Sequence, residues 1–252
     1  MRERVAKDKL KLIGLVNNAG YNESSVMELV PLDKLRKQFD GLGSPPPLFL
    51  VPSYPIINFL SFSFFFFFNT KVNVFAQVAM TQAFLPLLRE FGDQAHHPRV
   101  VFVASGFGHI TFPLVGPYAA TKHAIVSIGE AFRMELQSWG IRVVVVSPGA
   151  IKTHFMDVTK DNHKENVLKE EEKGGEVVKS YAKRSSELMA KQIVMEKLNS
   201  TTKVTNEALE ASLLDTEPLF EYFPGMDSSF GVPVVTSLPT IFMDRVFGRF
   251  FR

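Results

Sequence analysis

Residues 116–150 read GPYAATKHAIVSIGEAFRMELQSWGIRVVVVSPGA, a long helical segment followed directly by an apolar strand. We predict a helix over residues 117–139, ended by Gly140. Residues 141–146 (IRVVVV) form a continuous apolar run, which is typical of a strand with both faces buried. Such strands belong to parallel sheets covered by helices, so this segment predicts an α/β fold.

The same pattern continues toward the N-terminus. Residues 99–104 (RVVFVA) form a second apolar strand, and residues 11–16 form a shorter one that ends at NNAG (17–20). Helical spacing covers residues 31–39 and 72–90, so helices alternate with strands. We therefore expect parallel strands connected by helices.

Downstream of Thr153 the pattern becomes helical over residues 155–252, which the family resemblance given below implies is the substrate-side region. The mixed charges of residues 164–173 predict a solvated helix face. The buried side of the following helix is predicted to hold Val177, Tyr181, Leu188, Val194 and Leu198. Three further apolar residues could line a pocket, namely Met156, Val158 and Leu168. We nevertheless expect most apolar residues of this region to form helix core.

Residues 41–71 do not fit this pattern. Residues 48–68 are long enough to span a bilayer, which needs about 20 apolar residues, but Pro52 and Pro55 lie inside them. If residues 41–71 are removed, the flanking segments join into one amphipathic helix, and the Phe run before Asn-Thr-Lys resembles a translated pyrimidine tract. We therefore expect a translated, unspliced intron here rather than a membrane span.

Composition narrows the functional class. The chain has 252 residues, 46% of them apolar, which suits a single domain over residues 1–252. A net charge of +2 gives no broad basic field for nucleic acid. There is no cysteine and no HExxH spacing, so we expect no metal site. The N-terminus shows no secretory signal, and we expect a cytoplasmic protein.

Three residues carry a recognisable chemistry. Tyr118 and Lys122 are four residues apart on the long helix, so their side chains share a face. A cation there is expected to lower the pKa of the phenol and make Tyr118 a general acid or base. Ser105 follows the RVVFVA strand, at the sheet edge where ligands bind. The alternative is a surface aromatic beside a solvated lysine, because a bare YxxxK spacing is common.

Several motifs occur together and in one order: NNAG (17–20), Ser105, YAATK (118–122), and SPG (147–149) with Thr153. This set resembles the short-chain dehydrogenase/reductase family, and within it the retinol and 17β-hydroxysteroid dehydrogenase-like members. The resemblance covers residues 10–155 apart from residues 41–71, with a weaker echo of the last family strand at residues 221–227. It implies a Rossmann-like, doubly wound parallel sheet and an NAD- or NADP-dependent oxidoreductase.

The resemblance also implies roles for individual residues. Tyr118 would be the acid/base, Lys122 would hold the nicotinamide ribose, and Ser105 would orient the substrate oxygen. Asn73 would complete the catalytic set by holding a water on a proton relay. The remaining residues implied to contact or support the cofactor are Asn17, Ala19, Gly20, Pro148, Gly149 and Thr153.

The chain departs from the family pattern at the cofactor loop. No TGxxxGxG stretch occurs, and neither does the residue that selects NAD or NADP. We therefore expect a sheet that lacks its first three strands, with residues 11–16 as an exposed edge and with weak cofactor binding.

The first functional hypothesis is hydride transfer between a nicotinamide and an apolar alcohol or ketone, such as a retinoid or steroid. The alternatives are a non-catalytic remnant or interaction protein, and a membrane-anchored protein that uses residues 48–68. The basic-aromatic tail (239–251) could rest on a membrane surface, with endoplasmic reticulum association, but we expect it to pack on the fold. By analogy with relatives, the 117–139 helix could pair in a homodimer.

Overall fold

The computed structural model describes residues 12–20, 73–92, 97–155, 157–161, 163–164, 175–195 and 200–247, with a few single residues between 22 and 35. The predicted insertion at 41–71, the candidate span at 48–68 and most of the predicted 31–39 helix lie outside the described residues. Across the part of the chain that is described, no helix has the length and apolar character needed to cross a bilayer.

Four parallel strands form the sheet, in the order β1-β2-β3-β4. They are β1 (Gly14–Asn17), β2 (Arg99–Val103), β3 (Arg142–Val146) and β4 (Glu221–Tyr222). Among the described residues, β1 pairs only with β2. The α/β parallel sheet is as predicted, although the first strand begins later than residue 11, with Leu12 making only an isolated bridge to Gly92.

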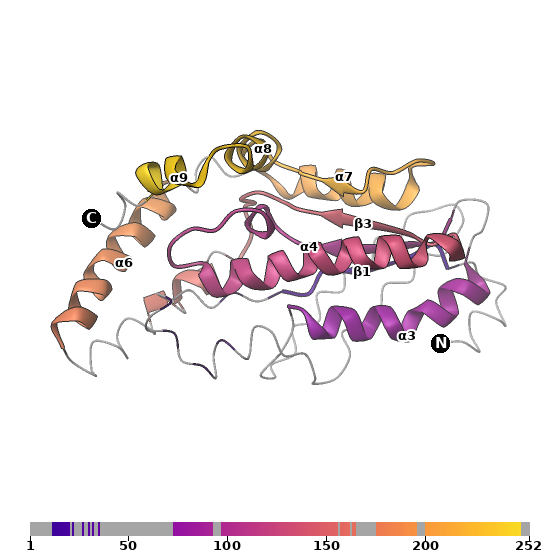
Figure 1. Cartoon of the computed structure of the whole chain (residues 1–252), viewed down its shortest axis with the longest axis horizontal. Helices are drawn as coiled ribbons and strands as arrows, with labels where there is room; N and C mark the ends of the chain where they lie inside the picture. The colour runs from indigo at the N-terminus through magenta and orange to yellow at the C-terminus, as the bar shows by residue number, and fades with distance from the viewer. Residues whose placement is uncertain are drawn as a thin grey trace.

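The two central strands alternate their side chains between two apolar layers. Val100, Phe102, Val143 and Val145 join the larger core, which includes side chains of α3 (Phe75–Phe91) and α4 (Gly116–Leu136). Val101, Val144 and Val146 face the opposite layer, against Ala208, Leu209 and Leu213 of α7 (Thr202–Leu214). Figure 1 shows α3 and α4 on one side of the sheet and α7 on the other. This two-sided burial explains why both strands are apolar without alternation.

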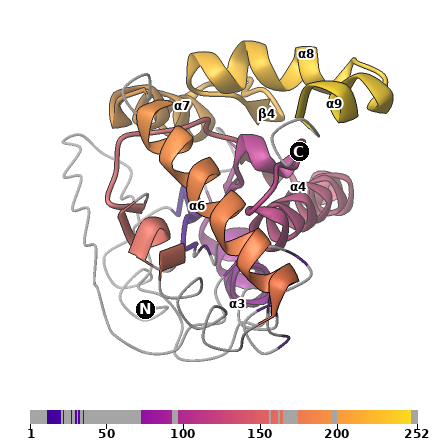
Figure 2. The same cartoon turned by 90° about the vertical axis from the view of Figure 1, so that its left-hand side faces the viewer.

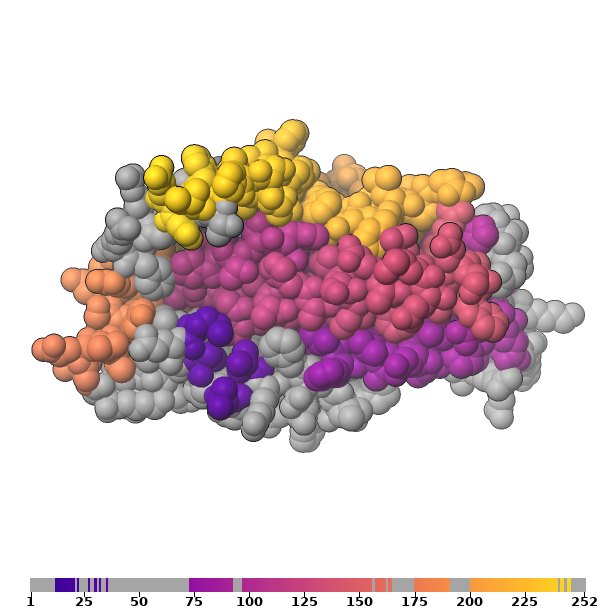
Figure 3. All heavy atoms as spheres, in the orientation of Figure 1, coloured from indigo at the N-terminus to yellow at the C-terminus, as the bar shows by residue number. Residues whose placement is uncertain are grey.

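Helix α4 lies close against β3 because of a glycine at the contact. A Cβ on Gly129 would lie 2.7 Å from Cγ2 of Val145, so no larger residue fits without a shift. The short 3-10 helix η2 (Gln137–Trp139) follows α4, and Gly140 ends it in the left-handed conformation, with φ 65°. The predicted end of the long helix is therefore confirmed. In the space-filling view, α4 and α3 form one broad face below the C-terminal segment (Figure 3).

The predicted inner face of helix α6 (Glu176–Met195) is confirmed only in part, since Tyr181 and Leu188 are half-buried. Val177 is 58% exposed, whereas Ala182, Ser185 and Met189 are buried. The buried residues follow i, i+3 and i+7 spacing, so small and polar side chains occupy part of the contact face. The prediction was wrong at Val177, because it followed apolar side chains only. Helix α6 lies beyond the carboxyl ends of the strands (Figures 1 and 2).

The C-terminal elements are η4 (Asp227–Gly231), α8 (Val232–Thr236) and α9 (Thr240–Phe247). On α9, Ile241 is 62% exposed and Phe242 is 49% exposed, so these two side chains do not pack on the fold as expected. Val158, a predicted core or pocket residue, is also exposed. These apolar side chains point to solvent because no described element lies over them.

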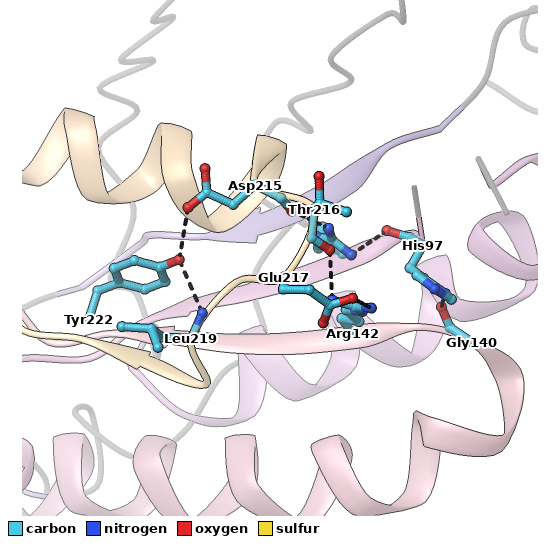
Figure 4. A network of polar contacts seen from close by, with 9 residues as sticks. His97, Gly140, Arg142, Asp215, Thr216, Glu217, Leu219 and Tyr222 are labelled. Carbon is cyan, nitrogen blue, oxygen red and sulfur yellow. Dashed lines mark hydrogen bonds and ion pairs between the residues drawn. The ribbon is translucent and has the colours of Figure 1, made fainter. Parts of the chain in front are cut away.

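A polar network holds the amino ends of β2 and β3 to the end of α7 (Figure 4). The guanidinium of Arg99 is buried and donates to the carbonyl oxygens of His97, at 2.8 Å, and Asp215, at 2.7 Å. Nearby, Arg142 forms a two-pronged ion pair with Glu217, with N–O distances of 2.7 and 2.8 Å. Backbone carbonyls at a helix end need such donors, so the network fastens α7 to the sheet.

We expect Arg99→Met to lower the free energy of unfolding by about 2–3 kcal/mol, because two carbonyl groups lose their buried partner. Arg142→Met removes an ion pair to an exposed carboxylate and should cost clearly less. Urea unfolding of both variants checks the difference. Equal losses would contradict the importance assigned to the buried guanidinium.

Candidate active site

The loops that follow the parallel strands meet at one edge of the sheet. Ser105 follows β2 and the turn 147–149 follows β3. Two backbone hydrogen bonds join these loops: the Ala104 N–H donates to Val146, and the Gly106 N–H donates to Pro148, both at 2.8 Å. The carboxyl edge of a parallel sheet is where ligands bind in open α/β folds.

Tyr118 and Lys122 point from α4 toward this edge, and both are buried. Tyr118 is 8% exposed and Lys122 is 3% exposed, which excludes the alternative of a surface aromatic beside a solvated lysine. The Lys122 Nζ donates to the carbonyl oxygen of Val103 at 2.9 Å, at the end of β2. The same nitrogen lies 5.7 Å from the centroid of the Tyr118 ring.

Burial dominates the protonation of this pair. It raises the pKa of Tyr118 to about 12, and hydrogen bonding with Ser105 opposes this rise only weakly. Burial also lowers the pKa of Lys122 to about 8. The pKa of Tyr118 is therefore raised and not lowered as expected, because burial penalises the charged phenolate.

Aromatic side chains surround the phenol. The Phe107 ring meets the Tyr118 ring edge-on, with centroids 6.4 Å apart, and the Phe155 ring is tilted against it at 5.7 Å. Ser105 caps the 3-10 helix η1 (Gly106–Gly108), where its hydroxyl accepts the Phe107 N–H at 3.2 Å. Sequence reasoning missed both phenylalanines. The position of Phe107, two residues after Ser105, could have indicated that its ring lies close to the site.

Asn73 is fully buried beside the start of α3. Its amide donates to the Thr121 hydroxyl at 3.0 Å, and that hydroxyl donates to the Tyr118 carbonyl at 2.7 Å. Among the described residues, a Cβ on Gly20 would meet the Lys122 Nζ, at 3.5 Å, and the Asn73 Oδ1, at 3.8 Å. The structure therefore brings Asn73, Lys122 and Gly20 together, as the motif order suggested.

A second polar group supports the loop after β1. The Asn17 amide donates to the Thr81 hydroxyl at 3.0 Å, and Gln77 donates to the Ala19 carbonyl at 3.0 Å. Asn17, Gln77 and Thr81 are all buried. Gln77 and Thr81 were not predicted, because a polar residue on a helix gives no sign of its partner in another element.

Of the last three predicted cofactor-side residues, two lie beside the Ser105 loop and the third, Thr153, is exposed. Pro148 and Gly149 lie in the turn after β3, next to the Ser105 loop. Thr153 is exposed, and its hydroxyl accepts only a weak contact from the Phe155 N–H, at 3.4 Å. Gly149 lies against the carboxylate of Asp227, a residue that the sequence reasoning did not single out.

Comparison with known proteins agrees with this geometry. The family model described as short chain dehydrogenase matches residues 68–166, which hold Ser105, Tyr118 and Lys122. Residues 68–166 therefore match the short-chain dehydrogenase family. Among curated relatives, human 11-beta-hydroxysteroid dehydrogenase type 2 is 27% identical over 85% of this chain and 45% of its own length. An NADPH-dependent 3-dehydrocapnine reductase from Ornithobacterium rhinotracheale is 33% identical over 56% of this chain and 39% of its own length.

Solved structures show the same fold. A short-chain dehydrogenase from Streptomyces avermitilis aligns with a TM-score of 0.58 at 18% identity, over 98% of this chain and 70% of its own. One from Burkholderia cenocepacia, solved in complex with NADP, aligns at 0.56 and 18% identity, over 92% of this chain and 67% of its own. The chain spans less than half the length of the first curated relatives it matches.

The buried Lys122 should make the stability of the protein depend on pH. Its folded-state pKa of about 8 lies below the ordinary 10.5, so between these values the unfolded chain binds more protons. The free energy of unfolding should therefore rise with pH across this interval, by about 3 kcal/mol in full.

Urea unfolding from pH 7.5 to 10 measures this rise, and Lys122→Met should abolish it. Lys183→Met, at an exposed position of α6, should leave it unchanged. Parallel pH profiles for the parent and Lys122→Met would show that the lysine is not buried in solution.

Proposed function

We propose that this protein is an oxidoreductase that transfers a hydride between a nicotinamide cofactor and an alcohol or carbonyl carbon of an apolar substrate. The observation that carries this proposal is the buried Tyr118–Lys122 pair, which lies beside Ser105 at the carboxyl edge of the sheet. The family match supports it, since the matched residues 68–166 include all three side chains.

Tyr118 is the proposed acid/base. Because burial raises its pKa to about 12, the phenol holds its proton at neutral pH and can donate it to a carbonyl oxygen. Ser105, whose hydroxyl interacts with the phenol, would bind the same oxygen and orient it. In the oxidising direction Tyr118 would accept the proton, and a protonated Lys122 would then stabilise the phenolate.

The residues present fit the nicotinamide-ribose end of a dinucleotide. An ammonium group has three donors, and the Val103 carbonyl accepts one from Lys122. The other two can meet ribose hydroxyls at Gly20, where the backbone is open apart from Lys122 and Asn73. When bound, the cofactor supplies the hydride, while this chain orients the reacting carbon and handles the proton. We propose a nicotinamide cofactor with no stated preference for NAD or NADP.

An apolar substrate, retinoid- or steroid-like, is proposed from two observations. Phe107 and Phe155 surround the phenol and give the site aromatic walls. The relatives include human 11-beta-hydroxysteroid dehydrogenase type 2 and rat retinol dehydrogenase 7, the latter 26% identical over 69% of this chain and 54% of its own length.

Titration with NADH and NADPH, followed by fluorescence, tests the proposal first. Binding of either supports an oxidoreductase, and binding of neither would favour a non-catalytic member of the family. If the parent protein binds the cofactor, Tyr118→Phe should lower kcat on a steroid or retinoid substrate by about 10²–10⁴-fold, because the proton transfer by the phenol is lost.

Tyr222→Phe is the matched control for Tyr118→Phe, because its hydroxyl contacts Leu219 and Asp215 in the network at the amino-end side of the sheet. Cofactor affinity should change little in Tyr118→Phe. Full activity in this variant would remove Tyr118 from the mechanism.

We also propose a peripheral membrane contact through α9. Ile241 and Phe242 are exposed on this helix beside Asp244 and Arg245, so the proposed contact rests on these two apolar side chains. Flotation with vesicles containing phosphatidylserine should recover the parent chain, and recovery should fall several-fold for the double variant Ile241→Ser, Phe242→Ser. Equal recovery of both proteins would contradict the contact.

A further inference from the structure

The C-terminal segment from β4 to η4 encloses the turn that follows β3. The Gly149 N–H donates to the Pro224 carbonyl at 3.0 Å, and the Ser228 hydroxyl donates to the Ser147 carbonyl at 2.7 Å. The Asp227 Oδ2 accepts the Ala150 N–H at 2.6 Å. Three residues of one short segment therefore fix the backbone of residues 147–150, more than 70 residues earlier in the chain.

Glycine at position 149 is required by Asp227. A Cβ there would lie 2.1 Å from the Asp227 Oδ1 and 2.4 Å from its Cγ, closer than atoms can approach. The carboxylate thus lies directly against the Gly149 backbone while it accepts the next N–H. The family motif places a glycine here, and in this chain the contact with Asp227 supplies a physical reason for it.

The same C-terminal segment also contacts the loop that contains Ser105. The Glu221 Oε1 accepts the Ser147 hydroxyl at 2.5 Å and lies 2.8 Å from the Nε2 of His109, four residues after Ser105. Glu221 therefore bridges the loops that follow β2 and β3. The Gly106–Pro148 backbone hydrogen bond closes the same connection at 2.8 Å.

We propose that Asp227 is a positioning residue for the cofactor-side turn: by accepting the Ala150 N–H, its carboxylate holds Pro148 and Gly149 in the conformation that binds the nicotinamide end. This inference rests on the proposed function, which assigns that turn to the cofactor. Asp227 is itself exposed, so it acts through backbone geometry and not through a buried charge. A charged acceptor makes a stronger hydrogen bond than a neutral one, and this suits it to order a turn.

Amide hydrogen exchange tests the positioning without any activity. In Asp227→Ala the exchange of the Ala150 amide should accelerate about tenfold, the effect of losing one charge-assisted hydrogen bond. Asp227→Asn keeps an acceptor oxygen and should restore most of the protection. Asp244→Ala, on α9, is the control for loss of an exposed aspartate and should leave this amide unchanged. Unchanged exchange in Asp227→Ala would overturn the proposal.

Cofactor binding supplies the second readout. Asp227→Ala should raise the Kd for NADH or NADPH about tenfold, and raise KM for the cofactor more than it lowers kcat. Asp227→Asn should recover most of the affinity. A loss of kcat with unchanged cofactor affinity would contradict a role at the cofactor side.

A double variant separates positioning from general loss of structure. Gly149→Ala alone should weaken cofactor binding and expose the Ala150 amide, because the new methyl displaces the carboxylate. Gly149→Ala combined with Asp227→Ala leaves room for that methyl and should be no worse than Asp227→Ala alone. Additive losses would show that Gly149 and Asp227 act independently, against the proposal. If the parent chain binds no cofactor, the proposed function fails, and Ala150 exchange in the same variants still decides whether Asp227 positions the turn.

Discussion

Two-sided burial of β2 and β3 is the constraint on which the other features depend. Alternate side chains of these strands pack against α3 and α4 on one face and against α7 on the other. A sheet covered in this way needs crossover connections, so its strands run parallel and their carboxyl ends share one edge. Residues far apart in the chain, including Asn17, Ser105 and Ser147, reach the same edge for this reason.

The same dry interior sets the chemistry of the candidate site. Lys122 has a backbone carbonyl as its acceptor at the end of β2, and burial opposes its charge. Burial also keeps the proton on Tyr118, so the phenol is an acid before any ligand arrives. A bound nicotinamide ribose and the hydroxyl or carbonyl oxygen of a substrate would change this balance, since both add partners for the charged forms. The pair is therefore a site whose protonation responds to occupancy.

The C-terminal segment has a structural part in the site as well as any part in substrate selection. Glu221, Asp227 and Ser228 bond to the turn after β3, and Glu221 also reaches His109 beside the Ser105 loop. A substitution in this segment would therefore change the geometry of the turn after β3. At the opposite end of the sheet, the Arg99 and Arg142 network anchors α7, which places β4 next to β3.

By itself, the sequence determined the local elements and the nature of the chemistry. The apolar runs at 99–104 and 141–146, the stop at Gly140 and the four-residue spacing of Tyr118 and Lys122 all depend on helix and strand periodicity, which neighbouring residues encode. Only the tertiary structure decided the buried face of α6, the raised pKa of Tyr118, and the contacts of Asn73 with Thr121 and of Ala150 with Asp227. These depend on which side chains packing removes from water and on partners 48 and 77 residues apart, and periodicity carries no information about either.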